Sequence, residues 1–294
     1  MNSLPTALPN HPHDRPPSSR NEKKTRRRVR AAIPAKDKNH LLLTVILPAR
    51  NEERNLGHVL AGLSRTFIAE GIPHQLVVVD DCSTDRTAEV ALKHSGSELE
   101  LVRRTPPHGF GRAIRDGLAC ARGRFIVIFM ADRSDDPRDA VRYYRALEEG
   151  YDCVYGSRFR PGSRLEKYPV VKLCVNRIVN RLISACFDLP FNDLTNAFKA
   201  YRRQVVEVCA PYHARHFDLT LEMSLRALVK GFRAKELPIS WQGRTWGSSQ
   251  LGLTHMGQHY VSTIVRLYLE YRGLTLLHPD RSANQKGADR SPLP

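Results

Sequence analysis

The chain has 294 residues, of which 41% are hydrophobic and 26% charged, and its formal net charge of +16 at pH 7 indicates an anionic partner. The six cysteines are scattered without a CxxC pair, which argues against a zinc ribbon or a disulfide scaffold and favours a reducing compartment. No apolar stretch approaches the ~18–20 residues that cross a bilayer.

Both ends of the sequence are predicted to be tails around one folded region, residues 40–273. Residues 1–39 carry ten Lys/Arg against three acids and hold almost nothing to bury. We expect this segment to be a disordered basic tail, which attracts anionic lipid or nucleic acid or is only a solvated linker. Residues 274–294 resemble a shorter flexible tail. The N-terminal end has no signal-peptide core, so we expect a cytoplasmic protein, peripherally attached to a membrane if attached at all.

Strands and helices alternate through residues 40–157. Strands are expected at 41–48, 76–81, 99–103, 125–130 and 152–156, and helices at 52–67, 84–94, 111–121 and 136–149. Strands that alternate with helices build right-handed βαβ units. The sequence therefore predicts an α/β fold with a Rossmann-like, mostly parallel sheet flanked by helices.

Residues 158–273 have a different pattern. Helices are expected at 170–187, 218–230 and 255–272, and strands at 196–201 and 234–240. Lys172, Arg177 and Arg181 lie beside the apolar stripe of the helix 170–187. That stripe either lies on a membrane surface or packs on the sheet, and the sequence leaves both open.

Acidic residues follow two of the predicted strands. Asp80 and Asp81 come after LVVV, and Asp132, Asp135 and Asp136 follow FIVIF. Parallel strands bring their carboxyl ends to one edge of the sheet, where ligands bind. Acids at this edge suit a ribose or base and a divalent metal, although each also suits a helix N-cap.

Other polar side chains carry weaker signals. Gly109-Phe110-Gly111 is only part of a dinucleotide fingerprint, and His255 and His259 have metal-ligand spacing without an HExxH glutamate. His213 and His216 lie in a polar turn and are expected to be solvated. Lys199, Arg202 and Arg203 are expected to contact phosphate or to be simply exposed. Trp241 and Trp246 are expected to cover a ligand, to touch a membrane or to pack in the core.

A set of ordered motifs resembles the family 2 glycosyltransferases with the GT-A fold, the nucleotide-diphospho-sugar transferase fold. Within them it is most similar to the dolichyl- and polyprenyl-phosphate mannose and glucose synthases. The resemblance covers roughly residues 42–260. The motifs are VILPARNEERNL (45–56), VVVDDCSTDRT (77–87), GFGRAIRDGL (109–118), FMADRSDDP (129–137), YGSRF (155–159), NDLTNAFKAYRR (192–203) and RTWGSSQL (244–251).

The resemblance implies roles for particular residues. Asp132 matches the last acid of the DxD metal motif and would hold Mg²⁺ or Mn²⁺, with Asp135 or Asp136 as further candidates for the metal or for sugar hydroxyls. The donor nucleotide sugar would be contacted by Pro48, Arg50, Glu52, Asp80, Asp81 and Ser134. The basic positions expected near phosphates, the acceptor phosphate among them, are Arg158, Arg177 and Arg244.

The sequence departs from the family pattern at two positions. Met130 stands where the first DxD acid is expected, and Gln250 where many relatives place Lys. The first departure leaves the metal to Asp132 and the donor diphosphate.

The activity implied by the resemblance is inverting transfer of mannose or glucose from GDP-mannose or UDP-glucose to polyprenyl or dolichyl phosphate. Peripheral membrane contact or a small membrane-protein partner would bring the lipid. The alternatives are a family 2 enzyme with a soluble or polysaccharide acceptor, and a non-catalytic nucleotide-sugar or nucleic-acid binder.

Overall fold

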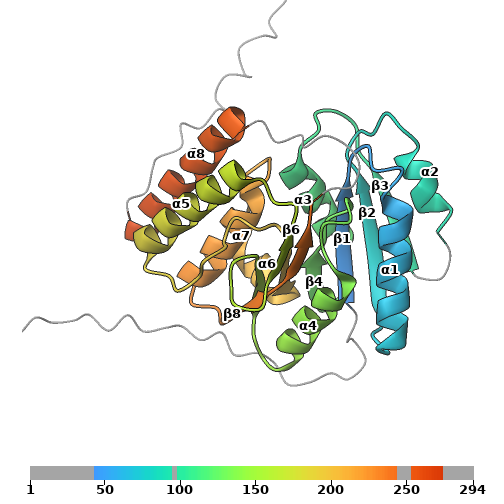
Figure 1. Cartoon of the computed structure of the whole chain (residues 1–294), viewed down its shortest axis with the longest axis horizontal. Coiled ribbons are helices and arrows are strands. Elements are labelled where there is room, and N and C mark those ends of the chain that lie inside the picture. The colour runs from blue at the N-terminus through green and yellow to red at the C-terminus, as the bar shows by residue number, and fades with distance from the viewer. Residues whose placement is uncertain (1–42, 95–97, 244–252, 274–294) are drawn as a thin grey trace, which may run out of the picture. The chain divides into compact units, whose positions relative to one another are not determined.

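The computed structural model describes residues 43–94, 98–243 and 253–273, so both predicted tails lie outside the described residues. A seven-stranded sheet in the order β3-β2-β1-β4-β7-β5-β8 forms the centre of the fold (Figure 1). Only β7 runs antiparallel to its neighbours β4 and β5. The prediction of an α/β fold with a mostly parallel sheet is confirmed. The strands of this sheet are β1 (Leu43–Ala49), β2 (His74–Asp80), β3 (Glu98–Arg103), β4 (Phe125–Ile128), β5 (Cys153–Ser157), β7 (Lys199–Arg202) and β8 (Ala234–Pro238).

Helices cover both faces of the sheet, as βαβ connections require. One core cluster joins the sheet to α1 and α4, and the other joins it to α3, α5, α6, α7 and α8. The residues of the central strands β1 and β4 are buried from both sides, which agrees with their continuous apolar runs. The helices are α1 (Leu56–Ala69), α2 (Thr87–Leu92), α3 (Phe110–Cys120), α4 (Pro137–Glu148), α5 (Val170–Phe187), α6 (Arg203–Cys209), α7 (Asp218–Val229) and α8 (Leu253–Arg272).

The second half of the chain contains short elements that the sequence pattern did not predict. The expected strand 234–240 is two strands: β8 ends at Pro238, and β9 (Ser240–Gln242) pairs with β6 (Arg164–Glu166) in a separate small sheet. A three-residue strand is too short to show a period of two, which is the signal that reveals longer strands. The helix α6 begins directly after β7, without a loop. Its seven residues are too few to show a clear helical period, so the sequence pattern did not predict it.

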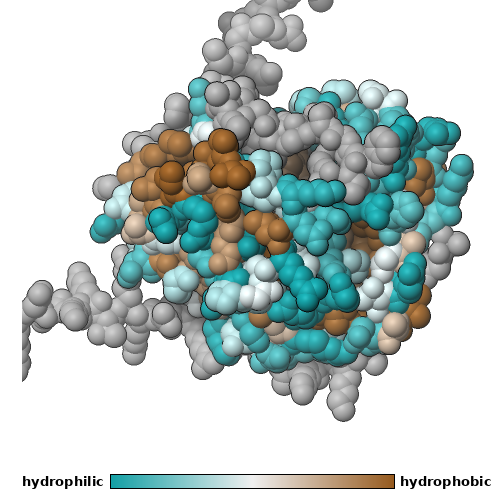
Figure 2. Space-filling model, in the orientation of Figure 1, coloured by the Kyte–Doolittle hydropathy of each residue, from teal (hydrophilic) through white to brown (hydrophobic). Residues whose placement is uncertain are grey.

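The exposure of the outer face of α5 excludes one of the two alternatives for its apolar stripe, packing on the sheet. Its apolar stripe does not pack on the sheet: Val171 is 69% exposed, Ile178 57% and Leu182 60%, while Ile183 and Phe187 on the opposite face are buried. Hydrophobic side chains gather over α5 and α8 in Figure 2. Val261 and Val265 of α8 are also exposed. Among the described residues, no helix has the length and apolar character that a bilayer-spanning segment needs.

Candidate active site

The ends of three neighbouring strands meet at one edge of the sheet. In the parallel registers, Ala49 of β1 is opposite Asp80 of β2, and Ile46 of β1 is opposite Ile128 of β4. The residues that follow these strands therefore lie at the same carboxyl edge, where open α/β sheets bind their ligands. This is the convergence that the sequence predicted for Asp80, Asp81 and Asp132.

A left-handed, non-glycine residue follows each of these three strands. Asn51 has φ of 55° after β1, Cys82 has 60° after β2, and Arg133 has 65° after β4. Such a conformation costs on the order of 1–3 kcal/mol per residue unless its surroundings impose it. In the first loop the surroundings are visible, because the Asn51 amide donates to Ser83 Oγ (3.0 Å) and its side chain accepts from the Thr84 amide (2.8 Å). Strain at three loops of one edge is typical of a functional site.

The segment after β1 is fixed mainly by Glu52. Its backbone carbonyl accepts hydrogen bonds from the amides of Asn55 and Leu56. The helix α1 begins at Leu56, whereas the sequence pattern predicted a start at Glu52. The Glu52 carboxylate accepts from the Asn55 side chain (2.7 Å). Pro48 is buried within β1. The Arg50 Nε is buried without a hydrogen-bond partner among the described residues, which leaves a donor for a ligand.

Asp80 and Asp81 have different surroundings. Both oxygens of Asp81 are occupied: one pairs with the Arg104 guanidinium and the other accepts from the Gly109 amide (2.7 Å). Asp80 accepts from the Ser83 amide (3.1 Å) and lies 4.0 Å from the exposed Arg103. Asp81 therefore fixes the loop before α3, and Asp80 retains more capacity for a ligand.

The segment after β4 brings Asp132 and Ser134 to this edge. Asp132 is 5% exposed, and its Oδ1 accepts from the Ser134 amide (3.1 Å). The Ser134 carbonyl in turn accepts from the Gln242 amide of β9 (3.0 Å). The small sheet that the sequence pattern missed thus fixes the position of the metal-motif segment.

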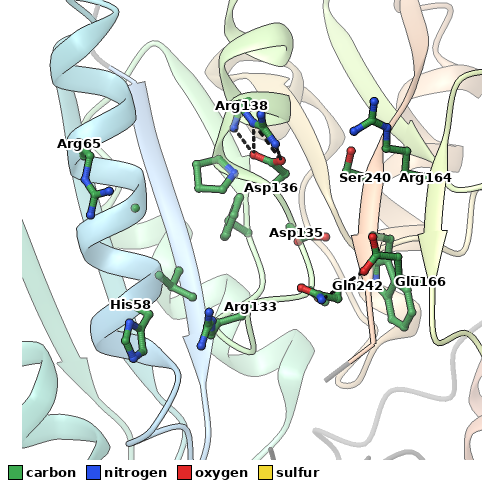
Figure 3. A pocket seen from close by; sticks show the side chains of 16 residues that line it. His58, Arg65, Arg133, Asp135, Asp136, Arg138, Arg164, Glu166, Ser240 and Gln242 are labelled. Atoms are coloured by element: carbon green, nitrogen blue, oxygen red, sulfur yellow. Dashed lines mark hydrogen bonds and ion pairs between the residues drawn. The ribbon is translucent and has the colours of Figure 1, made fainter. Parts of the chain in front are cut away.

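The structure separates the two remaining acids of this segment. Asp136 is the N-cap of α4, where it accepts from the Arg138 amide (2.9 Å) and pairs with the Arg138 guanidinium (Figure 3). Although partial burial opposes its ionisation, these bonds lower the pKa of Asp136. Asp136 thus takes the capping alternative, whereas Asp135 points into the protein, where its Oδ2 accepts from the Met130 amide (3.1 Å).

Asp132 and Asp135 together form a donor set that suits a hard divalent cation. Burial and then the charge of Asp132 raise the pKa of Asp135 well above its usual value, and the Oδ1 of Asp135 has no hydrogen-bond partner among the described residues. Mg²⁺ and Mn²⁺ prefer such carboxylate oxygens. No group of three or more His, Cys, Asp or Glu in the described ranges can hold a metal, so the other ligands would have to come from a bound diphosphate or water.

A cleft of about 470 Å³ lies beside these acids, between α1, the start of α4 and the small sheet. Figure 3 shows Asp135, Arg133 and Gln242 around it. Trp241 lines the cleft, and its ring meets that of Tyr168 edge-on at 4.9 Å. Tyr168 accepts from Arg158 Nη1 (3.2 Å), so the cleft and the Arg158 cluster share a wall.

Arg158 follows β5 in a buried cluster. Its Nε and Nη2 donate to the two oxygens of Asp193 at 2.8 and 2.7 Å. Burial opposes the charge, yet Asp193 keeps the pKa of Arg158 above its usual value. Arg177 of α5 lies on the same Phe159 ring as Arg158, with guanidinium carbons 4.9 and 5.3 Å from its centre. Two of the three predicted phosphate-site arginines are therefore together, and the third, Arg244, lies outside the described residues.

The expectation for Lys199 and its neighbours was wrong. Lys199 and Arg202 are buried, and Arg203 donates to the carbonyls of Ala121 and Gly123, so these cations bond the protein's own oxygens. Sequence reasoning also missed Arg104, which holds Asp81, and Asp193, which holds Arg158. Asp193 stood within the NDLTN motif, but nothing in the sequence paired it with a particular arginine.

The fold and this edge of acids define a GT-A nucleotide-diphospho-sugar transferase. The profile of the family described as Glycosyl transferase family 2 matches residues 44–209. The chain belongs to this family and is a glycosyltransferase.

Several characterised or named proteins are similar to the chain in sequence. Polyprenol monophosphomannose synthase of Mycolicibacterium smegmatis is 28% identical over 70% of this chain and 80% of its own length. Dolichol-phosphate mannosyltransferase of Pyrococcus furiosus is 29% identical over 71% of this chain, which spans only 59% of that longer protein. An uncharacterized glycosyltransferase of Mycobacterium bovis is 31% identical over 71% of this chain and 89% of its own length.

The fold is similar to solved glycosyltransferase structures. Glucosyl-3-phosphoglycerate synthase of Mycobacterium tuberculosis, in complex with Mn²⁺, uridine diphosphate and phosphoglyceric acid, has a TM-score of 0.60 and 19% identity over 80% of each chain. The same enzyme with Mg²⁺ and uridine diphosphate has a TM-score of 0.58 and 18% identity over 80% of this chain and 81% of that one. At this identity the likeness concerns the fold.

Proposed function

We propose that the protein is an inverting hexosyltransferase that moves mannose or glucose from a nucleotide diphosphate sugar to polyprenyl or dolichyl phosphate. The observation that carries the proposal is the shared wall between the cleft beside Asp135 and the arginine cluster, through Trp241 and Tyr168. Two anionic reactants must meet in this reaction, and we assign the acids to a metal and the neighbouring arginines to a phosphate. The names of the mannosyltransferase relatives support the lipid acceptor.

On the donor side, Asp80 and the Arg50 segment would bind the nucleoside. Asp132, with Asp135, would hold Mg²⁺ or Mn²⁺, which supplies positive charge to the leaving diphosphate. The orphaned Oδ1 of Asp135 supports this assignment over a sugar-hydroxyl contact. Ser134, buried beside Asp132, would orient the diphosphate end of the donor.

On the acceptor side, Arg177 and the Nη1 edge of Arg158 would bind the lipid phosphate. Asp193 already accepts from Nε and Nη2 of Arg158. Arg158 would therefore contribute a fixed positive charge to the phosphate site and not a bidentate pair of donors. Arg244 is proposed as a third phosphate contact on the resemblance alone. An array of cations lowers the repulsion between two phosphates and so favours the transition state.

The chemistry needs no strong general base. The phosphate oxygen of the acceptor is already anionic at neutral pH, and it attacks the anomeric carbon from the face opposite the leaving group. The new carbon–oxygen bond forms as the bond to the nucleoside diphosphate breaks, which inverts the anomeric configuration. The protein contributes orientation and charge, which are the main resources of such a displacement.

A lipid acceptor requires contact with a membrane, and α5 is the proposed contact. It combines the exposed apolar stripe with Lys172, Arg177 and Arg181 and contains no Asp or Glu. An amphipathic helix of this kind lies in the interface of an anionic bilayer. On its inner edge, Asn180 donates to Thr195 Oγ1 (2.9 Å), next to the Arg158 cluster. The lipid surface and the acceptor site would thus be two sides of one helix, although a small membrane protein is the alternative occupant.

The test is an activity assay with purified protein, GDP-mannose or UDP-glucose, Mn²⁺, and undecaprenyl or dolichyl phosphate in detergent. We expect release of nucleoside diphosphate that depends on the lipid. Asp132→Asn keeps the acceptor for the Ser134 amide but removes the charge, and should lower turnover about a hundredfold or more. Glu149→Ala removes an exposed carboxylate paired with Lys235 far from the cleft and serves as the control.

Two outcomes would overturn parts of the proposal. Turnover that is equal with and without the lipid would mean that the sugar passes to water or to another component of the assay, and would remove the lipid phosphate as the acceptor. Equal activity of Asp132→Asn and Glu149→Ala would remove Asp132 from the catalytic machinery.

A further inference from the structure

A second cavity, of about 410 Å³, lies between the first turn of α3, the loop 210–217 before α7, and α8. Among the described residues it shares no lining residue with the donor-side cleft. None of the residues assigned above to the donor, the metal or the acceptor lines it. The cavity therefore needs an explanation of its own.

Three arginines from three segments line this cavity: Arg112 of α3, Arg215 of the loop and Arg266 of α8. Within the described part of the chain, Asp218 is the one carboxylate in the lining. Both of its oxygens already accept hydrogen bonds, from the His216 amide (3.2 Å) and from Thr263 Oγ1 (2.8 Å). The lining is thus strongly cationic.

The positive charge is only partly balanced by neighbouring acids. Arg266 pairs with Glu222 at 3.0 Å, just outside the cavity. Arg112 and Arg215 form no ion pair with any described carboxylate. Their charges act on the adjacent Arg115: burial lowers the pKa of Arg115, and Arg112 and Arg215 lower it further, against the opposing effect of Glu222. An anion in the cavity would relieve this repulsion.

Histidine side chains also line this cavity and add hydrogen-bonding nitrogens to its wall. His108, His213, His216 and His259 line the cavity, and the rings of His216 and His259 lie 4.6 Å apart. The expectation that His213 and His216 form only a solvated turn is therefore incomplete, because they complete a wall with α3 and α8.

The walls that carry these cations are held in place. A Cβ at Gly109 or Gly111 would lie 2.6 or 2.7 Å from a carbonyl oxygen of the loop, so only glycine allows this approach. The Gly111 amide donates to the Arg215 carbonyl (3.1 Å), and Arg115 donates to the Ala214 carbonyl (2.8 Å). These contacts fix the backbone from which Arg112 and Arg215 extend, so the two residues are held on neighbouring walls of the cavity.

We propose that this cavity is a second anion site, which binds a phosphate or diphosphate group. Arginine forks match phosphate oxygens, and imidazoles supply further donors. The volume exceeds that of a single phosphate and leaves room for a diphosphate or a phosphorylated headgroup. The site does not depend on which sugar or acceptor the enzyme uses.

The ligand has two possible sources. On α8, the lining residues Ser262 and Thr263 stand next to Val261 and Val265, which belong to the exposed apolar surface. A lipid headgroup could reach the cavity from that surface, and a free anion could enter from solvent. Both present the same chemistry to the arginines, so the experiment has to separate them.

The first arm measures binding of inorganic diphosphate by calorimetry in metal-free, phosphate-free buffer. We expect binding to the unmodified protein and at least about tenfold weaker binding to Arg112→Gln/Arg215→Gln. The matched control Arg145→Gln/Arg233→Gln removes two charges that line neither cavity and should bind like the unmodified protein.

The second arm identifies the source with vesicles of equal charge that contain phosphatidic acid or phosphatidylglycerol. A preference for phosphatidic acid that Arg112→Gln/Arg215→Gln abolishes assigns a lipid headgroup, and diphosphate binding without that preference assigns a free anion. The proposal is overturned if neither probe binds, or if the arginine variant and the control bind alike. Equal thermal midpoints of both variants without ligand establish that they are folded.

Discussion

Lys199 is a buried cation that stabilises the fold and does not belong to the candidate active site. It is fully buried, and its Nζ donates to Leu194 O (2.7 Å), Thr220 O (2.9 Å) and Ser224 Oγ (2.6 Å). Burial lowers the pKa of Lys199 to about 7, an effect that Asp193 partly opposes. The three oxygens satisfy all three donors of an ammonium, so the residue ties β7 to α7.

A pH prediction follows at this residue. The unfolded chain keeps the Lys199 proton up to about pH 10.4, whereas the folded protein releases it near neutrality. Between these values the unfolded state binds more protons, so the free energy of unfolding rises with pH, by at most about 1.4 kcal/mol per unit. Lys199→Met lacks this contribution. Urea unfolding of both proteins between about pH 7 and pH 9 should show unmodified protein gaining stability relative to the variant, and a constant or falling difference would contradict the lowered pKa.

The same scale shows why some site residues were predictable and their partners were not. Asp132 and Asp80 follow apolar strands, and the rule that parallel strands end at one edge places them together. Arg158 also follows a strand, β5, but its role near a phosphate was implied by the resemblance alone. Its partner Asp193 lies 35 residues further on, and the pairing depends on how α5 and the loop after it fold back. Such a contact has no local periodicity and cannot be read from the sequence.

At the scale of elements, α5 was predicted with the bounds that the structure has, Val170–Phe187. Its apolar spacing, and the proline before it, are strong local signals. The sequence could not decide between membrane and core for the stripe, because both environments select the same residues. The strands β6 and β9 could not be predicted, because three residues are too few to show a repeating hydrophobic pattern.

A prediction about membranes belongs to this helix. Ile178→Ser/Leu182→Ser should reduce cosedimentation with phosphatidylglycerol vesicles by about tenfold or more, because burying each side chain contributes about 1.5–3 kcal/mol. Since both side chains are exposed, the thermal midpoint should change little. Vesicles of neutral lipid should bind the unmodified protein more weakly, because Lys172, Arg177 and Arg181 lose their anionic partner.

The matched control is Ile68→Ser/Leu92→Ser. These two side chains are equally exposed, at 62% and 70%, but belong to α1 and to the end of α2, on the opposite side of the molecule from α5 and α8 (Figure 1). The control variant should bind vesicles like the unmodified protein. Equal losses in both variants would mean that adsorption is non-specific and that α5 is not the docking face.

At the scale of the whole molecule, the sheet is asymmetric in function. The strands β1, β2 and β4 deliver acids to their carboxyl edge, whereas the chain after β5 supplies arginines and the exposed helices. The alternation of strands and helices allowed the first half to be predicted almost element by element. In the second half the long helices and the strands 196–201 and 234–240 were predicted, but the antiparallel direction of β7 and the separate small sheet depend on non-local pairing and were not.

The last prediction tests how the metal and the donor depend on one another across this edge. A ligand that binds only the folded state stabilises it by mass action, by about 2.7 kcal/mol at a hundredfold excess over its dissociation constant, which is several degrees in the thermal midpoint. Guanosine or uridine diphosphate should raise the midpoint strongly with Mn²⁺ and weakly without it. In the proposed function, Asp80 and the Arg50 segment would contact the nucleoside, whereas Asp132 would act through the metal. Asp132→Asn should therefore lose the Mn²⁺-dependent part of the shift and keep the metal-free part. Loss of both parts would mean that Asp132 shapes the nucleoside site itself, and an undiminished Mn²⁺ effect would mean that the metal binds elsewhere.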